Sequence, residues 1–425
     1  MTAGALNVIK NNSNVIFCMN PQITFFKSVY RKYTKFARTE KIYDMDGGGI
    51  SKNSDDVKIT ISSDGDLLSN ISLNIVCTKF SSERNGSNIE NDMGTQIFED
   101  VTLKVKRTAE KLSSKYINMH ARLNNPISTN ATYQINDEQK IICTNGNRYQ
   151  NMSLCGGVIN TDQNFSAYRS EPNCSYTNFN IIIPLPFSFS KDTGTALPVF
   201  LFWESPGDIS LDVRVNQTWL NSAQSIVGEN DISNIGLKAI CTWYDISEYE
   251  QRRFKSSDQE YLVEKIKEKS ANHSPSINIR GLLSNQPIKG IYLVCKGTHA
   301  LSDTNSILHY NNIKYQLKIG TVGLFNDFLP HTYFSKKNIY EYFIGCNYSE
   351  TLTNFHSTKI EGDVAFIPFC LKMSDGPSGC INSKNALDLE ISGNDNDKIS
   401  IDIYIIYYNI LKISDKSVKY VYAPD

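Results

Sequence analysis

Apolar and polar residues alternate along most of this chain of 425 residues, and this pattern restricts its fold more than any other feature. Val57–Ile61 alternates, residues 62–66 read as a polar turn, and Ile71–Val76 alternates again. Because successive side chains of a strand point to opposite faces, this pattern predicts strands with one buried face. The same alternation recurs in residues 101–105, 209–215 and 399–405.

Helical spacing is confined to two short segments. Residues 25–33 carry an apolar residue at every fourth position, and residues 254–269 place apolar residues among Glu and Lys. A parallel sheet needs a helical segment of roughly 10–15 residues between most of its strands. Since such segments are missing, the pattern favours antiparallel sheets packed face to face, of which the jelly roll is the common double Greek-key form.

Three short motifs occur once in each half of the chain, in the same order. The pairs are Leu67–Asn70 with Leu282–Asn285, Leu185–Phe187 with Ile367–Phe369, and Ile209–Val215 with Ile399–Ile405. A repeat of several motifs in one order indicates two copies of one structural unit.

We therefore predict an all-β chain of two tandem eight-stranded antiparallel jelly rolls with short helices. The expected divisions are an N-terminal arm at residues 1–24, a first jelly roll at residues 25–220 and a second at residues 221–425. The boundary is placed where Asn, Gln, Ser and Gly cluster, between Val215 and Ile235.

The charges are balanced, with 43 basic and 44 acidic side chains and a formal net charge of −1. Proteins that coat nucleic acid depend on clustered cations, so this balance argues against specific nucleic-acid binding as the main role. The N-terminus shows no secretory signal pattern. The longest apolar stretch, Ile399–Leu411, is shorter than the roughly 20 residues that span a bilayer.

The ten cysteines include no pair separated by two residues, so neither a zinc knuckle nor a thioredoxin-type redox pair is expected. We expect reduced and mostly buried thiols. Gly47–Gly49 lacks the Lys and Ser or Thr of a phosphate-binding loop, and no Gly-x-Ser-x-Gly motif is present. Asn394–Asp397 lacks the later glycine and glutamate of a calcium loop and reads as a turn. No catalytic residue, cofactor or metal is therefore predicted.

Lys27, Arg31 and Lys35 repeat every four residues near the N-terminus, beside the apolar series of residues 25–33. On a helix these would form one cationic and one apolar stripe. One interpretation is a helix that covers the end of a sandwich with its cations in water. The other is a docking surface for an acidic partner, lipid headgroups or nucleic acid.

Asn20–Phe36 closely resembles the opening signature of the major capsid proteins of nucleocytoplasmic large DNA viruses. Four later segments are similar to parts of the same family. They are Gly65–Leu68, like an early hairpin; residues 184–198, like the end of the first jelly roll; Glu250–Phe254 with Glu260–Glu264, like a helix that opens the second; and Gly376–Gly379 with Asn382, like a turn before the closing strands.

This resemblance implies a double jelly roll that forms homotrimeric, pseudo-hexameric capsomers, which tile an icosahedral shell in the virion. It also implies contacts with neighbouring capsomers and minor capsid proteins, and assembly in the host cytoplasm, often over an inner membrane. Cys370–Asp375 departs from the family, which usually carries an apolar residue followed by Arg-Pro-Glu there.

Two alternatives remain open from the sequence. The chain could be a minor capsid paralogue, for example a vertex component. It could also be a β-sandwich that binds or hydrolyses carbohydrate, although Trp203, Trp219 and Trp243 are few and fall near the expected junction.

Overall fold

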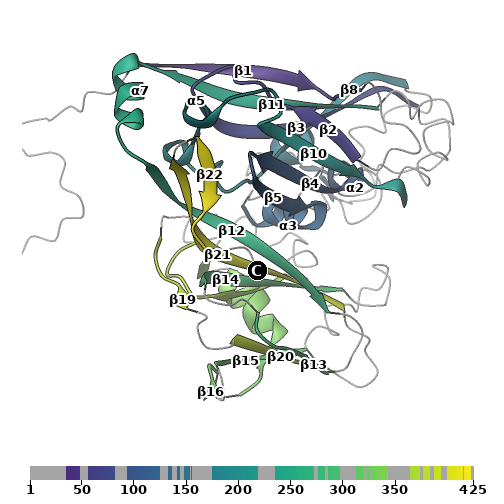
Figure 1. The fold of residues 1–425 in the computed structure, drawn as a ribbon. Coiled ribbons are helices and arrows are strands. Elements are labelled where there is room, and N and C mark those ends of the chain that lie inside the picture. The colour runs from purple at the N-terminus through teal and green to yellow at the C-terminus, as the bar shows by residue number, and fades with distance from the viewer. Residues whose placement is uncertain are drawn as a thin grey trace, which may run out of the picture.

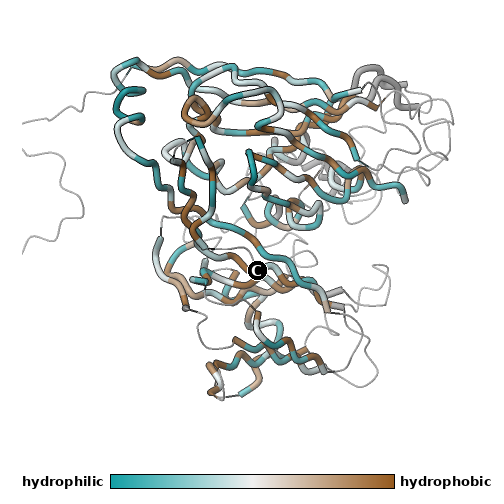
Figure 2. The backbone as a smooth tube through the Cα atoms, viewed as in Figure 1, coloured by the Kyte–Doolittle hydropathy of each residue, from teal (hydrophilic) through white to brown (hydrophobic). Residues whose placement is uncertain are grey.

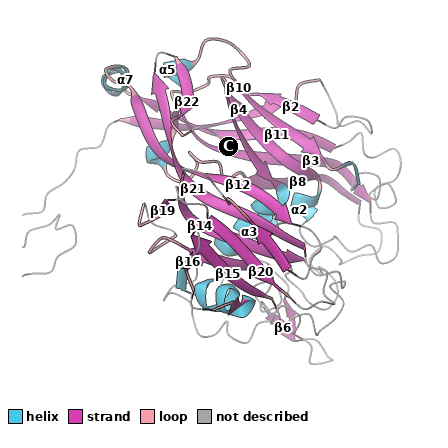
Figure 3. Ribbon diagram, turned by 60° about the horizontal axis from the view of Figure 1, so that its bottom comes forward, coloured by secondary structure: helices cyan, strands magenta, loops and turns pink. Residues whose placement is uncertain are grey.

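The fold comes from a computed structural model of the chain. It describes residues 35–47, 56–81, 93–124, 133–135, 141–143, 148–153, 155, 175–218, 235–271, 276–282, 286–296, 313–319, 322–325, 327–339, 341–342, 364–373, 377–382, 387–393, 400–414 and 416–422. Strands dominate these residues, as the all-β prediction requires (Figures 1 and 3).

The first sandwich consists of two antiparallel sheets. One sheet has the order β1-β11-β3-β8, and the facing sheet has the order β2-β10-β4-β5. The strands are β1 (Phe36–Asp44), β11 (Ile235–Ile246), β3 (Leu67–Ser81) and β8 (Ser175–Pro184), then β2 (Asp56–Thr60), β10 (Ile209–Val215), β4 (Phe98–Val105) and β5 (Thr108–Ser113).

The second sandwich repeats this plan with the sheets β12-β21-β14-β18 and β13-β20-β15-β16. The strands are β12 (Gln259–Ala271), β21 (Ser400–Ser414), β14 (Pro287–Lys296) and β18 (Val364–Pro368), then β13 (Ser276–Ile279), β20 (Leu387–Ser392), β15 (Lys314–Ile319) and β16 (Val322–Gly323). Taken in chain order, each strand of the first sandwich has a counterpart at the same place in the second. The prediction of two copies of one antiparallel unit is therefore confirmed.

Shorter elements accompany these sheets. Strands β9 (Leu197–Pro198), β17 (Leu329–Pro330), β19 (Ile381–Asn382) and β22 (Ser417–Tyr420) pair beside the main paths, and β6 (Tyr133–Ile135) pairs with β7 (Ile141–Cys143). The helices are α2 (Met93–Gln96), α3 (Ser114–Asn124), α4 (Arg148–Ser153), η2 (Thr193–Thr195), α5 (Val199–Phe202), α7 (Glu248–Lys255) and η4 (Tyr333–Asn338). The expected count of eight strands per unit stays a prediction.

The apolar-Pro-Phe motif lies at equivalent places in the two sandwiches, since it follows β8 in the first and includes the last two residues of β18 in the second. The motif Leu67–Asn70 begins β3, whereas residues 283–285 of its counterpart lie outside the described residues. The third pair does not correspond, because Ile209–Val215 is β10 whereas residues 400–405 begin β21, in the other type of sheet. Alternating isoleucine suits any half-buried strand, so this motif carries little information about position.

The change of sandwich comes later than expected. Strand β11 pairs with β1 and β3, so the chain stays in the first sandwich to Ile246. The expected boundary between residues 220 and 221 therefore falls within the first sandwich. Its polar residues link β10 to β11, whereas the charged helix α7, teal in Figure 2, links the two sandwiches.

The helical pattern of residues 254–269 corresponds to a helix only at its start, where α7 ends. The rest of the prediction is wrong, since Gln259–Ala271 forms β12 and pairs with β21 along its whole length. As a strand, β12 buries Val263 and Lys265 while Leu262 remains 47% exposed. Long-range pairing has here overridden a local helical pattern.

The strands on either side of the turn at residues 62–66 do not form the early hairpin that the sequence suggested, because β2 and β3 lie in opposite sheets of the first sandwich. Residues 61–66 carry the chain from one sheet to the other. At Gly65 an added Cβ would lie 2.8 Å from Cβ of Trp243, so the crossing passes too close to β11 for a larger residue. Trp243 is fully buried and donates its Nε1–H to Tyr43 Oη at 3.1 Å.

Among the cysteines whose burial the structure describes, Cys155, Cys241 and Cys370 are buried and Cys380 is exposed. The expectation that the thiols are reduced stays a prediction. Within the described ranges, no helix has both the length and the apolar character needed to cross a membrane.

Candidate functional site at the junction of the sandwiches

The two sandwiches share an apolar interface formed by the outward face of the sheet β12-β21-β14-β18. Strand β21 is buried on both faces: Ile403 and Ile405 belong to the core of the second sandwich, while Tyr404 and Ile406 join the core of the first. On β14, Tyr292 also joins the first core. The hydrophobic core of the first sandwich therefore continues across the junction instead of ending at a wet surface.

The end of the chain reinforces this contact. The C-terminal hairpin, defined as the last part of β21 with β22, runs beside the first sandwich (Figure 1). Leu411, Ile413 and Val418 of this hairpin are buried in the first core. Lys416 also forms an ion pair with Glu204 of the first sandwich at 3.2 Å. The last strands of the chain thus hold the second sandwich against the first.

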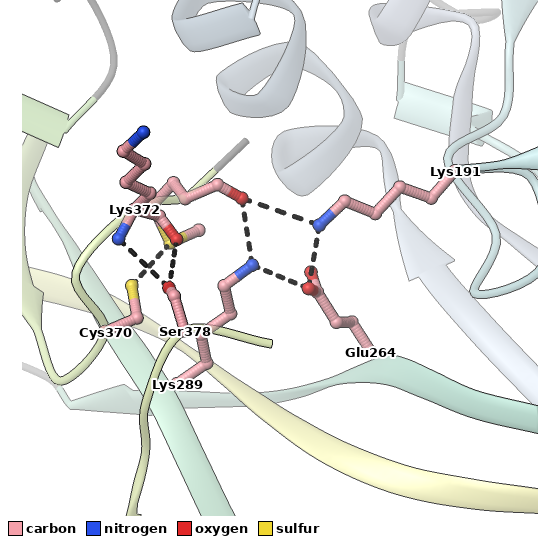
Figure 4. Close-up of polar contacts among 7 residues, drawn as sticks. Lys191, Glu264, Lys289, Cys370, Lys372 and Ser378 are labelled. Atoms are coloured by element: carbon pink, nitrogen blue, oxygen red, sulfur yellow. Dashed lines mark hydrogen bonds and ion pairs between the residues drawn. The ribbon is translucent and has the colours of Figure 1, made fainter. Parts of the chain in front are cut away.

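A polar group of four residues, which we call the Glu264 cluster, lies beside this apolar contact (Figure 4). Glu264 Oε1 accepts hydrogen bonds from Nζ of Lys289 at 2.6 Å and Nζ of Lys191 at 2.7 Å. The carbonyl oxygen of Met373 accepts from the same two ammonium groups, at 2.9 Å from Lys289 and 3.5 Å from Lys191. Lys191 comes from the first sandwich and the other three residues from the second.

Lys289 is the most buried member, with 0% of its side chain exposed, while Glu264 is 22% exposed. Burial lowers the pKa of Lys289, and the neighbouring carboxylate of Glu264 opposes this shift. Burying an ammonium group is costly unless it is paired and hydrogen-bonded. The carboxylate and the carbonyl meet this requirement for Lys289.

Local backbone contacts hold Lys289 in place. The pairing of β14 with β21 shifts register between Ile288 and Gly290, and the N–H of Phe369 donates to the carbonyl of Lys289 at 2.9 Å. At Gly290 an added Cβ would lie 2.7 Å from the ring of Phe366, so glycine allows this close approach.

The loop after β18 presents the carbonyl of Met373. Ser378 Oγ accepts from the N–H of Lys372 at 3.0 Å and donates to the carbonyl of Lys372 at 2.8 Å. Cys370 Sγ lies 3.5 Å from Met373 Sδ. This loop contains the residues that depart from the family pattern, and the departure therefore lies in the junction itself.

A second polar group, the Glu110 cluster, lies at the C-terminal hairpin. Glu110 of β5 accepts from the N–H of Ser188 at 2.8 Å, from Ser188 Oγ at 2.7 Å and from Tyr420 Oη at 3.4 Å. Lys265 Nζ lies 3.5 Å from the ring centroid of Tyr420. Burial raises the pKa of Glu110 and lowers that of Lys265, and the charge of each opposes the shift of the other.

Further contacts continue along the junction. Glu268 accepts from Ser113 Oγ at 2.7 Å, and Lys115 lies 3.7 Å from Asp402. The rings of Tyr116 and Tyr404 lie 5.6 Å apart. Each of these pairs joins one residue of the first sandwich to one of the second.

A crevice of about 460 Å³ opens between the sandwiches beside the Glu264 cluster, and Lys191, Glu264 and His120 of α3 line it. Burial lowers the pKa of His120 to about 4, and the charge of Lys191 adds to this shift while that of Glu264 opposes it. The imidazole is therefore neutral at neutral pH.

Of the three predicted docking residues, the structure describes Lys35, which is exposed immediately before β1, while Lys27 and Arg31 lie outside the described residues. The docking interpretation stays a prediction. The part of the chain that the structure describes contains no group of His, Cys, Asp and Glu side chains arranged to hold a metal ion.

Sequence reasoning missed the junction residues. One signal was present, since Lys289 is a single cation in the apolar run of Pro287–Val294. A lone charge in a strand of this kind indicates a buried and paired group. Its partners, however, lie far away in the sequence.

Comparison with known proteins identifies the relatives of this fold. Residues 24–248 match the family model described as the major capsid protein N-terminus. The chain is 25% identical over 317 residues to capsid protein 1 of Acanthamoeba polyphaga mimivirus, covering 70% of this chain and 49% of that protein. It is 22% identical over 429 residues to the major capsid protein of Pyramimonas orientalis virus, covering 97% of each.

The major capsid protein of Paramecium bursaria Chlorella virus 1 is 26% identical over 303 residues, which cover 68% of this chain and 59% of that protein. The chain thus spans about half to three fifths of two of these relatives. Among solved structures, PBCV-1 VP54 matches with a TM-score of 0.65 at 19% identity, over 94% of this chain and 100% of that one. The Faustovirus major capsid protein matches with a TM-score of 0.56 at 9% identity, over 96% of each. These structural matches support the double jelly-roll fold.

Proposed function

Since the chain belongs to the major capsid protein family of nucleocytoplasmic large DNA viruses, we propose that it is a shell protein that works by self-association and not by catalysis. The observation that carries this proposal is the pair of sandwiches with the same strand order, joined where the core of the first continues onto β21 and β14 of the second. Two similar units held in one rigid chain allow three chains to present six similar sides.

The proposed assembly is a homotrimeric capsomer with a pseudo-hexagonal outline, and capsomers pack side by side into an icosahedral shell of the virion. The net charge of −1 supports dense packing, because many copies meet without strong long-range repulsion. Contacts with minor capsid proteins and with an inner membrane, and assembly in the host cytoplasm, belong to the same proposal and are supported by the family resemblance.

We also propose that the two jelly rolls divide at α7. The family model ends at residue 248, where α7 begins, and this agrees with the pairing of β11 in the first sandwich. Residues 1–24, proposed as an N-terminal arm, lie outside the described residues.

The described residues do not support a sugar-binding alternative. Trp243 is buried and packs in the core, and Glu110, Glu264 and Glu268 accept hydrogen bonds across the junction. A sugar platform needs exposed aromatic rings, and glycosidase chemistry needs two carboxyl groups facing a shared substrate. The minor capsid alternative is not favoured either, since the chain matches a major capsid protein over 97% of both lengths.

The test is the oligomeric state of the purified full chain. Sedimentation velocity is expected to show trimers of the 48.0 kDa subunit, and negative-stain microscopy is expected to show particles with a hexagonal outline. Only monomers at high protein concentration, with no hexagonal particles, would contradict the proposal.

A further inference from the structure

The junction combines two kinds of contact with different physical properties. Apolar burial on β21 supplies attraction between the sandwiches, but the hydrophobic effect has no preferred direction. Hydrogen bonds from ammonium groups depend on distance and angle. We propose that the Glu264 cluster positions the second sandwich, so that Glu264 and Lys289 set its angle to the first by receiving Lys191.

Three members of the cluster form a preformed acceptor site within the second sandwich. Lys289 holds Glu264 Oε1 at 2.6 Å and the carbonyl of Met373 at 2.9 Å, so both acceptors stay in place. Lys191 is the single member from the first sandwich, and it enters between these two oxygens (Figure 4). A small rotation of one sandwich against the other would move Lys191 away from both acceptors.

The supporting contacts make this acceptor site rigid. The main chain of Lys289 is fixed by the N–H of Phe369, and the loop bearing Met373 is fixed by the two bonds between Ser378 and Lys372. Because the two acceptor oxygens are already held in place, little conformational freedom is lost when Lys191 binds them. The site therefore favours one position of the Lys191 ammonium group.

The same geometry argues against a mainly stabilising role. Removing charged groups from water costs free energy that their attraction only partly returns, and apolar replacements of similar size are often neutral or stabilising. The apolar contact of Tyr404 and Ile406 already holds the sandwiches together. The Glu264 cluster therefore contributes more to the relative orientation of the two sandwiches than to the strength of their association.

Charge also explains why Glu264 is central. The ammonium groups of Lys191 and Lys289 approach the same carboxylate oxygen, so they lie close to each other. Without the carboxylate, two like charges would face each other at the junction. Replacing Glu264 alone should thus destabilise the junction, whereas replacing all three charged residues removes both the attraction and the repulsion.

The test measures the distance between the sandwiches by pulsed dipolar electron paramagnetic resonance. Spin labels are attached through genetically encoded p-acetylphenylalanine at two exposed positions, Arg107 between β4 and β5 and Ser276 in β13. This chemistry leaves the native cysteines unlabelled. Labelled chain is diluted with unlabelled chain, so that only distances within one subunit are recorded.

The decisive variant combines Lys191→Met, Glu264→Leu and Lys289→Met. It is expected to keep the wild-type thermal transition but to show a broadened or shifted distance distribution. The single variant Lys191→Met leaves the acceptor site in place and should give the same change, which keeps the test valid if the triple variant does not fold. The control is Lys318→Met with Glu390→Leu, a pair at 2.7 Å within the second sandwich, which should leave the distances unchanged.

A folded triple variant and a folded Lys191→Met variant that both retain the wild-type distance distribution would overturn the inference. These measurements are made within one subunit, so they stand apart from the proposed function: failure of the wild-type chain to form trimers contradicts that function alone. A further expectation rests on the proposed function. If the chain forms hexagonal capsomers, the variants should stay folded but lose regular hexagonal particles.

Discussion

The two sandwiches share one strand order but treat the outward face of equivalent sheets in opposite ways. In the first sandwich, the outer face of β1-β11-β3-β8 is exposed along β1 and its neighbour β11: Ile42 is 60% exposed, and Asp44 pairs with Lys238 at 2.8 Å. In the second, the outer face of β12-β21-β14-β18 is buried, with Tyr404 at 2% and Ile406 at 4% exposure. Sheets of the same topology therefore have a solvent-exposed outer region in the first sandwich and a buried outer face in the second.

This difference shows that side chains, and not topology, decide where the two units meet. The outward positions of β21 include the large apolar residues Tyr404 and Ile406, whereas those of β11 include Lys238 and the partly exposed Ile240. Burying Asp44 and Lys238 would cost desolvation of both charges. The junction therefore forms on the sheet whose outward positions are inexpensive to bury.

The largest expected effect comes from placing a charge on each outward face. Ile406→Asp should lower the free energy of unfolding by on the order of 4 kcal/mol, because it buries an unpaired carboxylate in the shared core. Ile240→Asp, on the equivalent strand β11, should cost about 1 kcal/mol, since water reaches that position. Urea unfolding followed by tryptophan fluorescence measures both, and equal losses would remove the distinction between the two faces.

The next effect separates the junction from a charge pair within one sandwich. Glu264→Gln should cost about 2–3 kcal/mol, because it leaves two ammonium groups without their shared carboxylate. Glu390→Gln removes the partner of Lys318, whose side chain is 35% exposed where that of Lys289 is 0%, and should cost at most about 1 kcal/mol. Chemical denaturation at neutral pH compares the two variants, and a larger loss at Glu390 would contradict the assignment of the junction as the sensitive site.

Acid should weaken the junction through His120 on the first-sandwich side. Its pKa falls to about 4 in the fold from a usual value of 6.5, so the unfolded chain binds the proton first as the pH drops. Stability from this group is thus fully present above pH 6.5 and is lost as the pH falls through about 4. His120→Gln should reduce this loss between pH 7 and 4.5 by about 1–2 kcal/mol.

The measurement is thermal or urea unfolding across this pH range for wild type and His120→Gln. The raised pKa of Glu110 acts with the opposite sign, since the folded state then holds a proton that the unfolded state has lost. Introducing Glu110→Gln into both the wild type and the His120→Gln variant removes the contribution of Glu110. An unchanged pH slope in the histidine variant would argue that His120 titrates normally in the fold.

The smallest effect concerns the C-terminal hairpin. Tyr420→Phe removes the hydroxyl that donates to Glu110 at 3.4 Å and should cost about 1 kcal/mol. Tyr422→Phe is the matched control, because the bonds of Tyr422 to Asn409 are made by its main chain. Thermal unfolding distinguishes them, and equal midpoints for the two variants would show that the Tyr420 hydroxyl contributes little.

Much of the fold was accessible from the sequence because its signals are local. The alternation at residues 57–61 and 71–76 identified strands, and the motif around Pro186, which follows β8, recurred at the end of the equivalent strand β18. Pairing was less accessible. The segment 259–271 carries helix-like spacing, and only its pairing with β21, more than a hundred residues away, makes it a strand.

The junction was the least accessible part of the molecule. Lys191, Glu264 and Lys289 carry no shared motif, and their meeting depends on how the loop after β8 reaches β12 and β14. The predicted cationic stripe, by contrast, was visible from regular spacing, and of its three residues the structure describes only Lys35.

The amino-acid order alone determined the strand content and the kinship with shell proteins, because both depend on patterns within a few neighbouring residues. Which strands pair, where one sandwich ends and how the two are joined were decided only in three dimensions. The physical reason is that burial and ion pairing depend on partners brought together by the fold, and Lys191 meets Glu264 only where the two sandwiches come together.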